Sequence, residues 1–211
     1  MAQLPLATMN PAKVGMLRRL ADGLGFDLLA GPDADAQPGD DEPDATHEGI
    51  AVHKAVAWSR LHPLVVLASD GGIVIPARGN AWESRLTRRQ TGEGEVPDET
   101  RARRLLGMMK AIEGERRAAH RVEAVAVARD GALLGAWEAQ GFHCRVGLDS
   151  QAPPAGTNGA WLESVLVAED GRRWGQLGDE EMHNAGEPWQ QLALPVRDLL
   201  ARLSVQGEKR G

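Results

Sequence analysis

The sequence predicts an α/β fold in which a mixed central sheet is flanked by helices. Stretches with the spacing of strands and stretches with the spacing of helices alternate along most of the chain. Residues 64–68 form a continuous apolar run, which is typical of a strand buried on both faces. Residues 122–128 and 132–137 are apolar runs separated by Arg-Asp-Gly, and an Asp-Gly pair in such a place indicates a hairpin.

The first two elements are a short apolar strand in the segment that begins at Leu4 and a helix that follows it directly. Asn10 is expected to cap this helix and Pro11 to occupy its first position, where a missing N–H costs nothing. The apolar residues that recur at helical spacing are Val14, Leu17, Leu20 and Leu24, and Gly25 ends the helix. The unpaired amides of such a helix start can bind phosphate, and Lys13 can add a positive charge. Alternatively, Asn10 only caps the helix and Lys13 is only solvated.

The elements predicted over residues 26–75 place Asp70 at the end of a buried strand. A second strand is predicted over residues 26–30, followed by a loop rich in Asp, Pro and Gly over residues 31–46. A helix is predicted over residues 47–61. The buried strand that follows is expected to end in the turn Ser69-Asp70-Gly71-Gly72, and a further strand to cover residues 73–75.

The second half is predicted to contain two helices and a set of strands that includes the hairpin. Residues 79–97 are polar and glycine-rich and are expected to form a loop, and a helix is predicted over residues 99–112. Beyond the hairpin, strands are predicted over residues 142–146 and 162–167. The last helix is expected over residues 196–203, with Pro195 in its first turn.

Composition limits the class of protein and its partners. A length of 211 residues and a charged share of 26% suit one soluble two-lobed domain over residues 1–211. The net charge of −6 argues against binding to a nucleic-acid backbone but not against a nucleotide. Cys144 is the only cysteine, and no apolar stretch reaches membrane-spanning length. We therefore expect a cytoplasmic protein without an intrachain disulfide, a nucleic-acid partner or a membrane segment.

Asp70 is the strongest candidate for chemistry. Ligands of open α/β sheets collect at the carboxyl ends of strands, and a carboxylate there suits a divalent metal or a general base. Glu48 and Lys54 lie on the preceding helix, whose dipole stabilises a carboxylate near its N-terminus. Two alternatives stay open: Asp70 caps its own turn, and Glu48 is only a surface carboxylate. His47 and His53 do not have the four-residue spacing of a helical zinc pair, so we set zinc aside.

Short motifs follow one another in a fixed order along the chain. The first is Thr-x-Asn-x-x-Lys, formed by Thr8, Asn10 and Lys13. Further motifs occupy residues 46–55, 68–73, 83–85, 116–118 and 130–131. In order and register they resemble the motifs of the inosine triphosphate pyrophosphatase family, over nearly the whole chain. That family has Thr-Phe-x-Glu-Asn-Ala-x-x-Lys-Ala, Ala-Asp-Asp-Ser-Gly-Leu, Ser-Ala-Arg, Arg-Arg-Ala and an Asp-Gly turn at these places.

The resemblance implies an enzyme that hydrolyses non-canonical purine nucleoside triphosphates to a monophosphate and diphosphate, with Mg²⁺ as cofactor. It also implies two lobes around a nucleotide cleft, and a homodimer. The resemblance assigns catalysis and metal binding to Asp70, together with Glu48. The residues that it implies for substrate binding are Thr8, Asn10, Lys13, Lys54, Gly71, Arg85 and Trp161.

The chain departs from the family at positions that matter for chemistry. Gly49 stands where the second motif has glutamate, so Glu48 lies one place early, and Ser69 replaces the first aspartate of the third motif. The family's Gly-Phe-Gly-Tyr-Asp-Pro falls on residues 159–164, its Glu-Glu-Lys on Glu180-Glu181-Met182, and its Ser-His-Arg on Gly186-Glu187-Pro188. The lysine, histidine and arginine that the resemblance assigns to the purine and the phosphates are absent. We therefore expect altered base selectivity.

Two interpretations stay open for the tryptophans and for the function. Trp82, Trp161 and Trp189 lie near positions that line the family's nucleoside pocket, so one could stack on a base, or each could pack in the core. The main hypothesis is a Mg²⁺-dependent pyrophosphatase of nucleoside triphosphates. The alternative is a non-catalytic nucleotide-binding or protein-interaction module on the same fold, which Gly49 and Ser69 motivate.

Overall fold

The computed structural model describes residues 2–8, 10–30, 46–61, 64–93, 96–151 and 160–208. The loop predicted over residues 31–46 lies outside these ranges, apart from Thr46. Within them, no helix is both long and apolar enough to cross a membrane. The chain divides into two units, each described by itself. Unit 1 comprises Met1–Asp70, Glu123–Ala139 and Trp189–Gly211, and unit 2 comprises Gly71–Val122 and Gln140–Pro188.

A mixed sheet of six strands has the order β2-β1-β3-β4-β5-β6. β1 (Ala2–Ala7) pairs in parallel with β2 (Phe26–Ala30) and with β3 (Val65–Val74). β4 (Ala118–Arg129) and β5 (Ala132–Val146) form the predicted hairpin, whose turn residues Asp130 and Gly131 both have positive φ, at 52° and 75°. β6 (Leu166–Val167) pairs antiparallel with β5. The predicted α/β class with a mixed sheet is confirmed.

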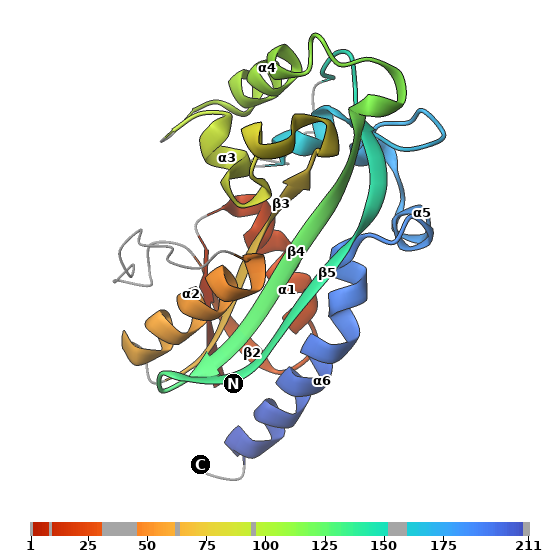
Figure 1. The fold of residues 1–211 in the computed structure, drawn as a ribbon. Coiled ribbons are helices and arrows are strands. Elements are labelled where there is room, and N and C mark those ends of the chain that lie inside the picture. Colours follow the sequence, from red (N-terminus) through yellow and green to blue (C-terminus); the bar gives the residue numbers. More distant parts are fainter. Residues whose placement is uncertain are drawn as a thin grey trace. The chain divides into compact units, whose positions relative to one another are not determined.

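Helices cover both faces of the strands in unit 1 (Figure 1). α1 (Pro11–Ala21) and α6 (Pro188–Glu208) pack on the face that carries the branched side chains Leu67, Val125 and Val127. α2 (His47–Leu61) packs on the other face, which carries small side chains: Ala68, Ala124, Ala126 and Ala128. The two sets alternate along the strands, because neighbouring residues of a strand point to opposite faces. Small side chains on the α2 face let this helix lie close to the sheet.

Unit 2 has its own apolar core and several short helices. Its core includes Ile73, Leu105, Met109, Phe142 and Trp161. Among its described residues the longest helix is α4 (Asp98–Met108), close to the predicted one. The 3₁₀ helices are η2 (Pro76–Ala81), η3 (Ser84–Leu86), η4 (Gly114–Arg117), η5 (Trp161–Ser164) and η6 (Trp174–Gln176), and the other α-helices are α3 (Thr87–Gln90) and α5 (Asp179–Asn184). The predicted loop over residues 79–97 thus contains helical turns.

Other predicted boundaries were wrong. β5 runs without a break to Val146, although Phe142 has a φ of 49° and donates its N–H to the carbonyl oxygens of Ala185 and Gly186. Only Leu166 and Val167 of the predicted strand at 162–167 pair with β5. α6 begins at Pro188 and continues through Pro195. Its buried residues, which hold the helix together across the proline, are Trp189, Leu192, Val196, Leu200 and Leu203.

Candidate functional site

Asp70 lies in the interior of β3 and not in a turn, so the turn predicted at residues 69–72 is wrong. The glycines allow a close approach of another segment instead. A Cβ on Gly72 would lie 2.0 Å from the carbonyl oxygen of Ser84. The hydroxyl of Thr87 accepts the N–H of Ile73 at 3.1 Å and so satisfies the backbone of β3 there. The alternative in which Asp70 caps its own turn is also wrong.

Strand periodicity turns Asp70 toward α2. Alternate residues of a strand share a face, so Asp70 follows Val66 and Ala68 on the face that this helix covers. On α2, His47 and Lys54 are seven residues apart, which is close to two helical turns. They therefore share one side of the helix. The buried residues of α2 in contact with that face are Ala51, Ala55 and Trp58.

Both oxygens of the Asp70 carboxylate are engaged by side chains from α2. His47 Nδ1 lies 2.6 Å from Asp70 Oδ2, and Lys54 Nζ lies 3.1 Å from Asp70 Oδ1. Asp70 is 7% exposed and His47 is 5% exposed, whereas the Lys54 side chain is 27% exposed. The site is therefore a buried carboxylate with a buried imidazole on one oxygen and a partly exposed ammonium on the other.

The charges around Asp70 keep it ionised. Burial raises the pKa of this carboxyl, because it disfavours the charged form. The charge of Lys13, the hydrogen bond from His47 and the charge of Lys54 together outweigh burial and lower the pKa to about 2. An ionised carboxylate can only accept hydrogen bonds. Nδ1 of His47 must therefore carry a hydrogen and donate this hydrogen bond to Asp70.

The segment between β1 and α1 brings three more predicted residues to this edge of the sheet. Parallel pairing with β3 places the carboxyl end of β1 beside the strand that carries Asp70. Asn10 caps α1 as predicted, since its side-chain oxygen accepts the N–H of Ala12 at 3.0 Å. Thr8 Oγ1 accepts the N–H of Asn10 at 3.2 Å. Lys13, in the first turn of α1, lies close enough to Asp70 to lower its pKa.

Glu48 lies in the first turn of α2 with an exposed side chain. Its N–H donates to Glu138 Oε2 at 3.2 Å, so a carboxylate from β5 lies at this helix start. Within the described ranges, no three carboxylate, imidazole or thiol groups converge as a metal cage would require. A metal role for Glu48 stays a prediction.

The Asp70 carboxylate is nevertheless a suitable ligand for magnesium. Asp70 is a buried and ionised oxygen ligand. Mg²⁺ is commonly bound by one or two carboxylates together with the phosphates of a substrate, and not by an all-protein cage. The residues present therefore fit a magnesium ion that binds together with a triphosphate, with Asp70 as the protein ligand.

The other predicted substrate-binding residues lie in unit 2. Gly71 follows Asp70 directly in β3, and Arg85 forms an ion pair with Glu83 at 2.8 Å. Trp161 is 5% exposed and packs in the apolar core of unit 2. Substrate binding by Gly71, Arg85 and Trp161 stays a prediction. The burial of Trp161 favours the interpretation in which this tryptophan packs in the core.

Sequence reasoning does not identify His47 or Glu138 as site residues. A signal for His47 exists, because it lies two helical turns before Lys54 and so shares its face. No local signal marks Glu138, which is 90 positions from its partner Glu48 in the chain.

A second buried charged group lies in unit 2. Arg121 and Glu187 form an ion pair whose side chains are 7% and 2% exposed. The guanidinium carbon of Arg121 also lies 3.9 Å from the ring centroid of Trp174, which is a cation–π arrangement. Glu187 occupies the position where the resembling motif has histidine. The Glu187 side chain therefore forms an ion pair with an arginine of the same unit.

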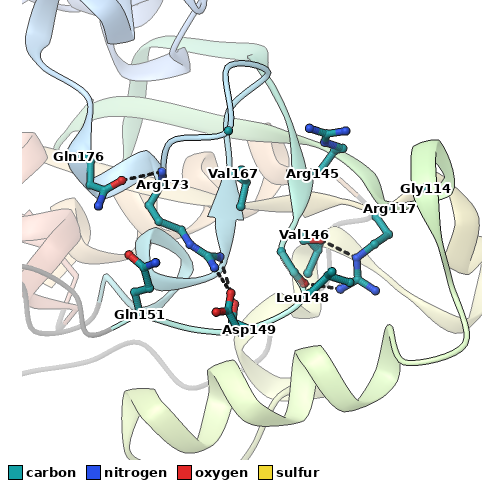
Figure 2. Close-up of a pocket in the computed structure, with 12 residues that line it drawn as sticks. Gly114, Arg117, Arg145, Val146, Leu148, Asp149, Gln151, Val167, Arg173 and Gln176 are labelled. Atoms are coloured by element: carbon teal, nitrogen blue, oxygen red, sulfur yellow. Dashed lines mark hydrogen bonds and ion pairs between the residues drawn. The ribbon is translucent and has the colours of Figure 1, made fainter.

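Figure 2 shows a pocket of about 420 Å³ in unit 2 with three arginines in its lining. Arg117 donates to the carbonyl oxygens of Val146, at 2.7 Å, and of Gly147. Arg173 donates to the carboxylate of Asp149. Arg145 is partly exposed and lies 3.7 Å from Glu115. Two of the three guanidinium groups therefore hold the segment after β5 in place, and we assign this pocket no part in the site.

Several proteins are similar to this chain over most of its length. A dITP/XTP pyrophosphatase from Symbiobacterium thermophilum is 34% identical over 95% of this chain and 96% of its own. A dITP/XTP pyrophosphatase from Geobacter sulfurreducens is 29% identical over 92% of this chain and 94% of its own.

Solved structures share the fold. A HAM1 protein from Coxiella burnetii has a TM-score of 0.67, 18% sequence identity and coverage of 99% of this chain and 100% of its own. A nucleoside-triphosphatase, or dITP/XTP pyrophosphatase, from Mycobacterium abscessus has a TM-score of 0.65, 24% identity and coverage of 91% and 97%. The sequence profile of the Ham1 family matches residues 4–185 of the chain. A match of that extent, together with the full-length relatives, shows that this chain belongs to the Ham1 family.

Proposed function

We propose that this chain is a Mg²⁺-dependent nucleoside triphosphate pyrophosphatase, which uses water to split its substrate into a nucleoside monophosphate and diphosphate. The observation that carries the proposal is the buried Asp70 carboxylate, held between His47 and Lys54 and close to Lys13. The relatives that match this chain over nearly its full length are named dITP/XTP pyrophosphatases, which supports pyrophosphatase activity for this chain.

The start of α1 and the two lysines form the proposed triphosphate site. The N-terminus of a helix attracts anions, because its first amides lack partners within the helix. Pro11 has no N–H, Ala12 donates to the Asn10 side chain and Val14 donates to the Asn10 carbonyl oxygen. Phosphate oxygens would therefore meet the backbone N–H and the ammonium of Lys13. Lys54 is 27% exposed and can reach a phosphate while it contacts Asp70. These positive groups bind the triphosphate and offset charge as diphosphate leaves.

Asp70 is proposed to hold the metal and to orient the attacking water, with Glu48 as a further ligand from the first turn of α2. When bound, Mg²⁺ would be held by Asp70 and would supply positive charge that stabilises the phosphates during the reaction. A pKa of about 2 makes Asp70 a weak base at neutral pH, since an effective general base titrates near the working pH. The low pKa thus favours ligation and orientation over proton abstraction by Asp70.

Altered base selectivity is the finer part of the proposal. The resemblance places donors for the purine at residues 182–188, where this chain has Met182, Glu187 and Pro188. Glu187 is buried against Arg121 and can offer a base no N–H donor. A site that loses its hydrogen-bond donors loses discrimination for the base that used them. We therefore propose that the preference for inosine- or xanthosine-type bases is weakened.

A homodimer in the cytoplasm completes the proposal. The dimer rests on the family resemblance alone, and light scattering coupled to gel filtration measures it directly. The cytoplasm suits a chain whose single cysteine, Cys144, is a buried thiol.

The test is diphosphate release from a panel of triphosphates: dITP, XTP and the standard ribo- and deoxyribonucleotides, each with Mg²⁺ and with EDTA. We expect release that requires the metal, with a spread of kcat/KM between bases of less than about 100-fold. Strong preference for dITP and XTP would refute altered selectivity and leave the pyrophosphatase standing. No release from folded protein would favour the non-catalytic module that Gly49 and Ser69 motivate.

A further inference from the structure

His47 is the one buried imidazole that contacts the proposed catalytic carboxylate in the described residues. Its Nδ1 is 2.6 Å from Asp70 Oδ2, and the side chain is 5% exposed. The proposed mechanism names this histidine as a neighbour of Asp70 but assigns it no role in catalysis. The resembling motif has phenylalanine at this position, a ring of similar size that could not donate a hydrogen bond. This chain therefore has a hydrogen bond to Asp70 that phenylalanine at this position could not form.

Two donors fix the carboxylate more firmly than one. A carboxylate held at a single oxygen can rotate about its Cβ–Cγ bond, because this torsion is broad. Here Lys54 takes Oδ1 and His47 takes Oδ2 from positions two helical turns apart on α2. The pair therefore sets the plane of the carboxylate as well as its position.

The two donors differ in rigidity. Lys54 reaches Asp70 with a flexible four-carbon chain that is partly exposed. His47 is a planar ring at the start of α2, with two rotatable bonds, and it is packed almost without solvent contact. Lys54 is also proposed to contact phosphate, so its distance to Asp70 changes most easily when a triphosphate binds. His47 is then the partner that keeps Asp70 in place.

We propose that His47 is a positioning residue, whose Nδ1–H holds the Asp70 carboxylate in the orientation that the reacting water and metal need. The inference rests on the proposed pyrophosphatase activity. Groups that orient a metal ligand through a hydrogen bond typically contribute 10- to 100-fold to metal affinity or activity. His47 does not touch the substrate, so its removal should lower kcat and leave KM for the triphosphate nearly unchanged.

The experiment compares three variants with wild type. His47→Phe keeps the ring and removes the donor, whereas His47→Asn keeps a donor close to the position of Nδ1. His53→Asn is the matched control, since His53 lies on the same helix and has no assigned role. Steady-state rates of diphosphate release are measured against triphosphate and against Mg²⁺. Circular dichroism and thermal melting check the fold of each variant.

We expect His47→Phe to lose about 10- to 100-fold in kcat, with KM for the triphosphate changed less than about threefold. Its half-saturating Mg²⁺ concentration should rise, and His47→Asn should recover most of kcat. His53→Asn should match wild type. Mn²⁺ binding, measured by electron paramagnetic resonance with a non-hydrolysable triphosphate analogue, should weaken in His47→Phe and recover in His47→Asn. This readout does not depend on turnover.

Several results would overturn the inference. Wild-type kcat in His47→Phe, or a change confined to KM, would show that His47 does not position Asp70. Equal losses in the Phe and Asn variants would point to packing instead of donation. If His47→Phe does not fold, the Asn variant is compared with His47→Gln, whose donor lies farther out, and equal rates would contradict positioning. Failure of wild type to release diphosphate from any triphosphate would refute the proposed function itself.

Discussion

Replacing Asp70 with asparagine should change how stability depends on pH. The pKa of this carboxyl is about 2 in the folded protein, below its ordinary value of 3.8, chiefly because Lys13, His47 and Lys54 outweigh the effect of burial. The difference corresponds to about 2 kcal/mol of stability at neutral pH, since one pKa unit is about 1.4 kcal/mol. Because the folded pKa is the lower one, this stability is present above about pH 4 and is lost as the pH falls toward 2. About 1 kcal/mol of it is already lost at pH 3.

Urea unfolding of wild type and Asp70→Asn at pH 6 and at pH 3 measures this loss. Between these pH values wild type should lose about 1 kcal/mol more of its free energy of unfolding than Asp70→Asn. Asp27→Asn is the matched control, because Asp27 is an exposed aspartate on β2 in the same unit. The free energy of unfolding of Asp27→Asn should change between these pH values by the same amount as that of wild type. If the Asp70→Asn and wild-type curves fall in parallel, positive groups do not hold this carboxylate, and the account of the site is refuted.

Three further predictions concern unit 2. Glu187→Gln removes the negative charge that neutralises the buried Arg121 and should lower the free energy of unfolding by about 3 to 5 kcal/mol in urea. A loss below about 1 kcal/mol would contradict the buried ion pair. Gly72→Ala places a methyl group 2.0 Å from the Ser84 carbonyl oxygen and should destabilise by at least about 2 kcal/mol. Gly15→Ala, where nothing lies within 4 Å of the added carbon, should be neutral or stabilising by up to about 1 kcal/mol, and equal effects of the two glycine substitutions would be inconsistent with the packing of β3. Burial raises the pKa of the Cys144 thiol to about 12, so the free energy of unfolding should fall as the pH rises above about 9. At about pH 8 the native protein should react with a thiol reagent only through unfolding. Immediate labelling would mean that this thiol is accessible.

Sequence reasoning succeeded where the signal is local. The Asn10 cap depends on residues within one turn of α1, and the Asp130-Gly131 turn depends on two positive φ angles, so neighbouring residues determine both. The buried strand before Asp70 follows from its continuous apolar run, although Asp70 itself lies inside β3 and not in the turn that the sequence predicts.

Sequence reasoning failed where distant residues decide the structure. The Gly71-Gly72 pair is typical of a turn, but here the second glycine admits the Ser84 backbone, which is not a neighbour in sequence. Pro195 is typical of a helix start, yet buried residues on both sides of it keep α6 continuous. The contact of His47 with Asp70 spans 23 positions and depends on how α2 packs on β3, so the sequence does not predict it. Contacts of this kind become visible only in the folded chain.

The central claim is that the Asp70 carboxylate, as held in this site, makes the chain a pyrophosphatase. The most direct test is diphosphate release by wild type, Asp70→Asn and the Asp27→Asn control, at saturating triphosphate and Mg²⁺. The account predicts metal-dependent release by wild type and by the control, and a loss of at least about 1,000-fold in kcat for Asp70→Asn in a variant that remains folded. Undiminished turnover by Asp70→Asn, or release by wild type that persists in EDTA, would contradict it.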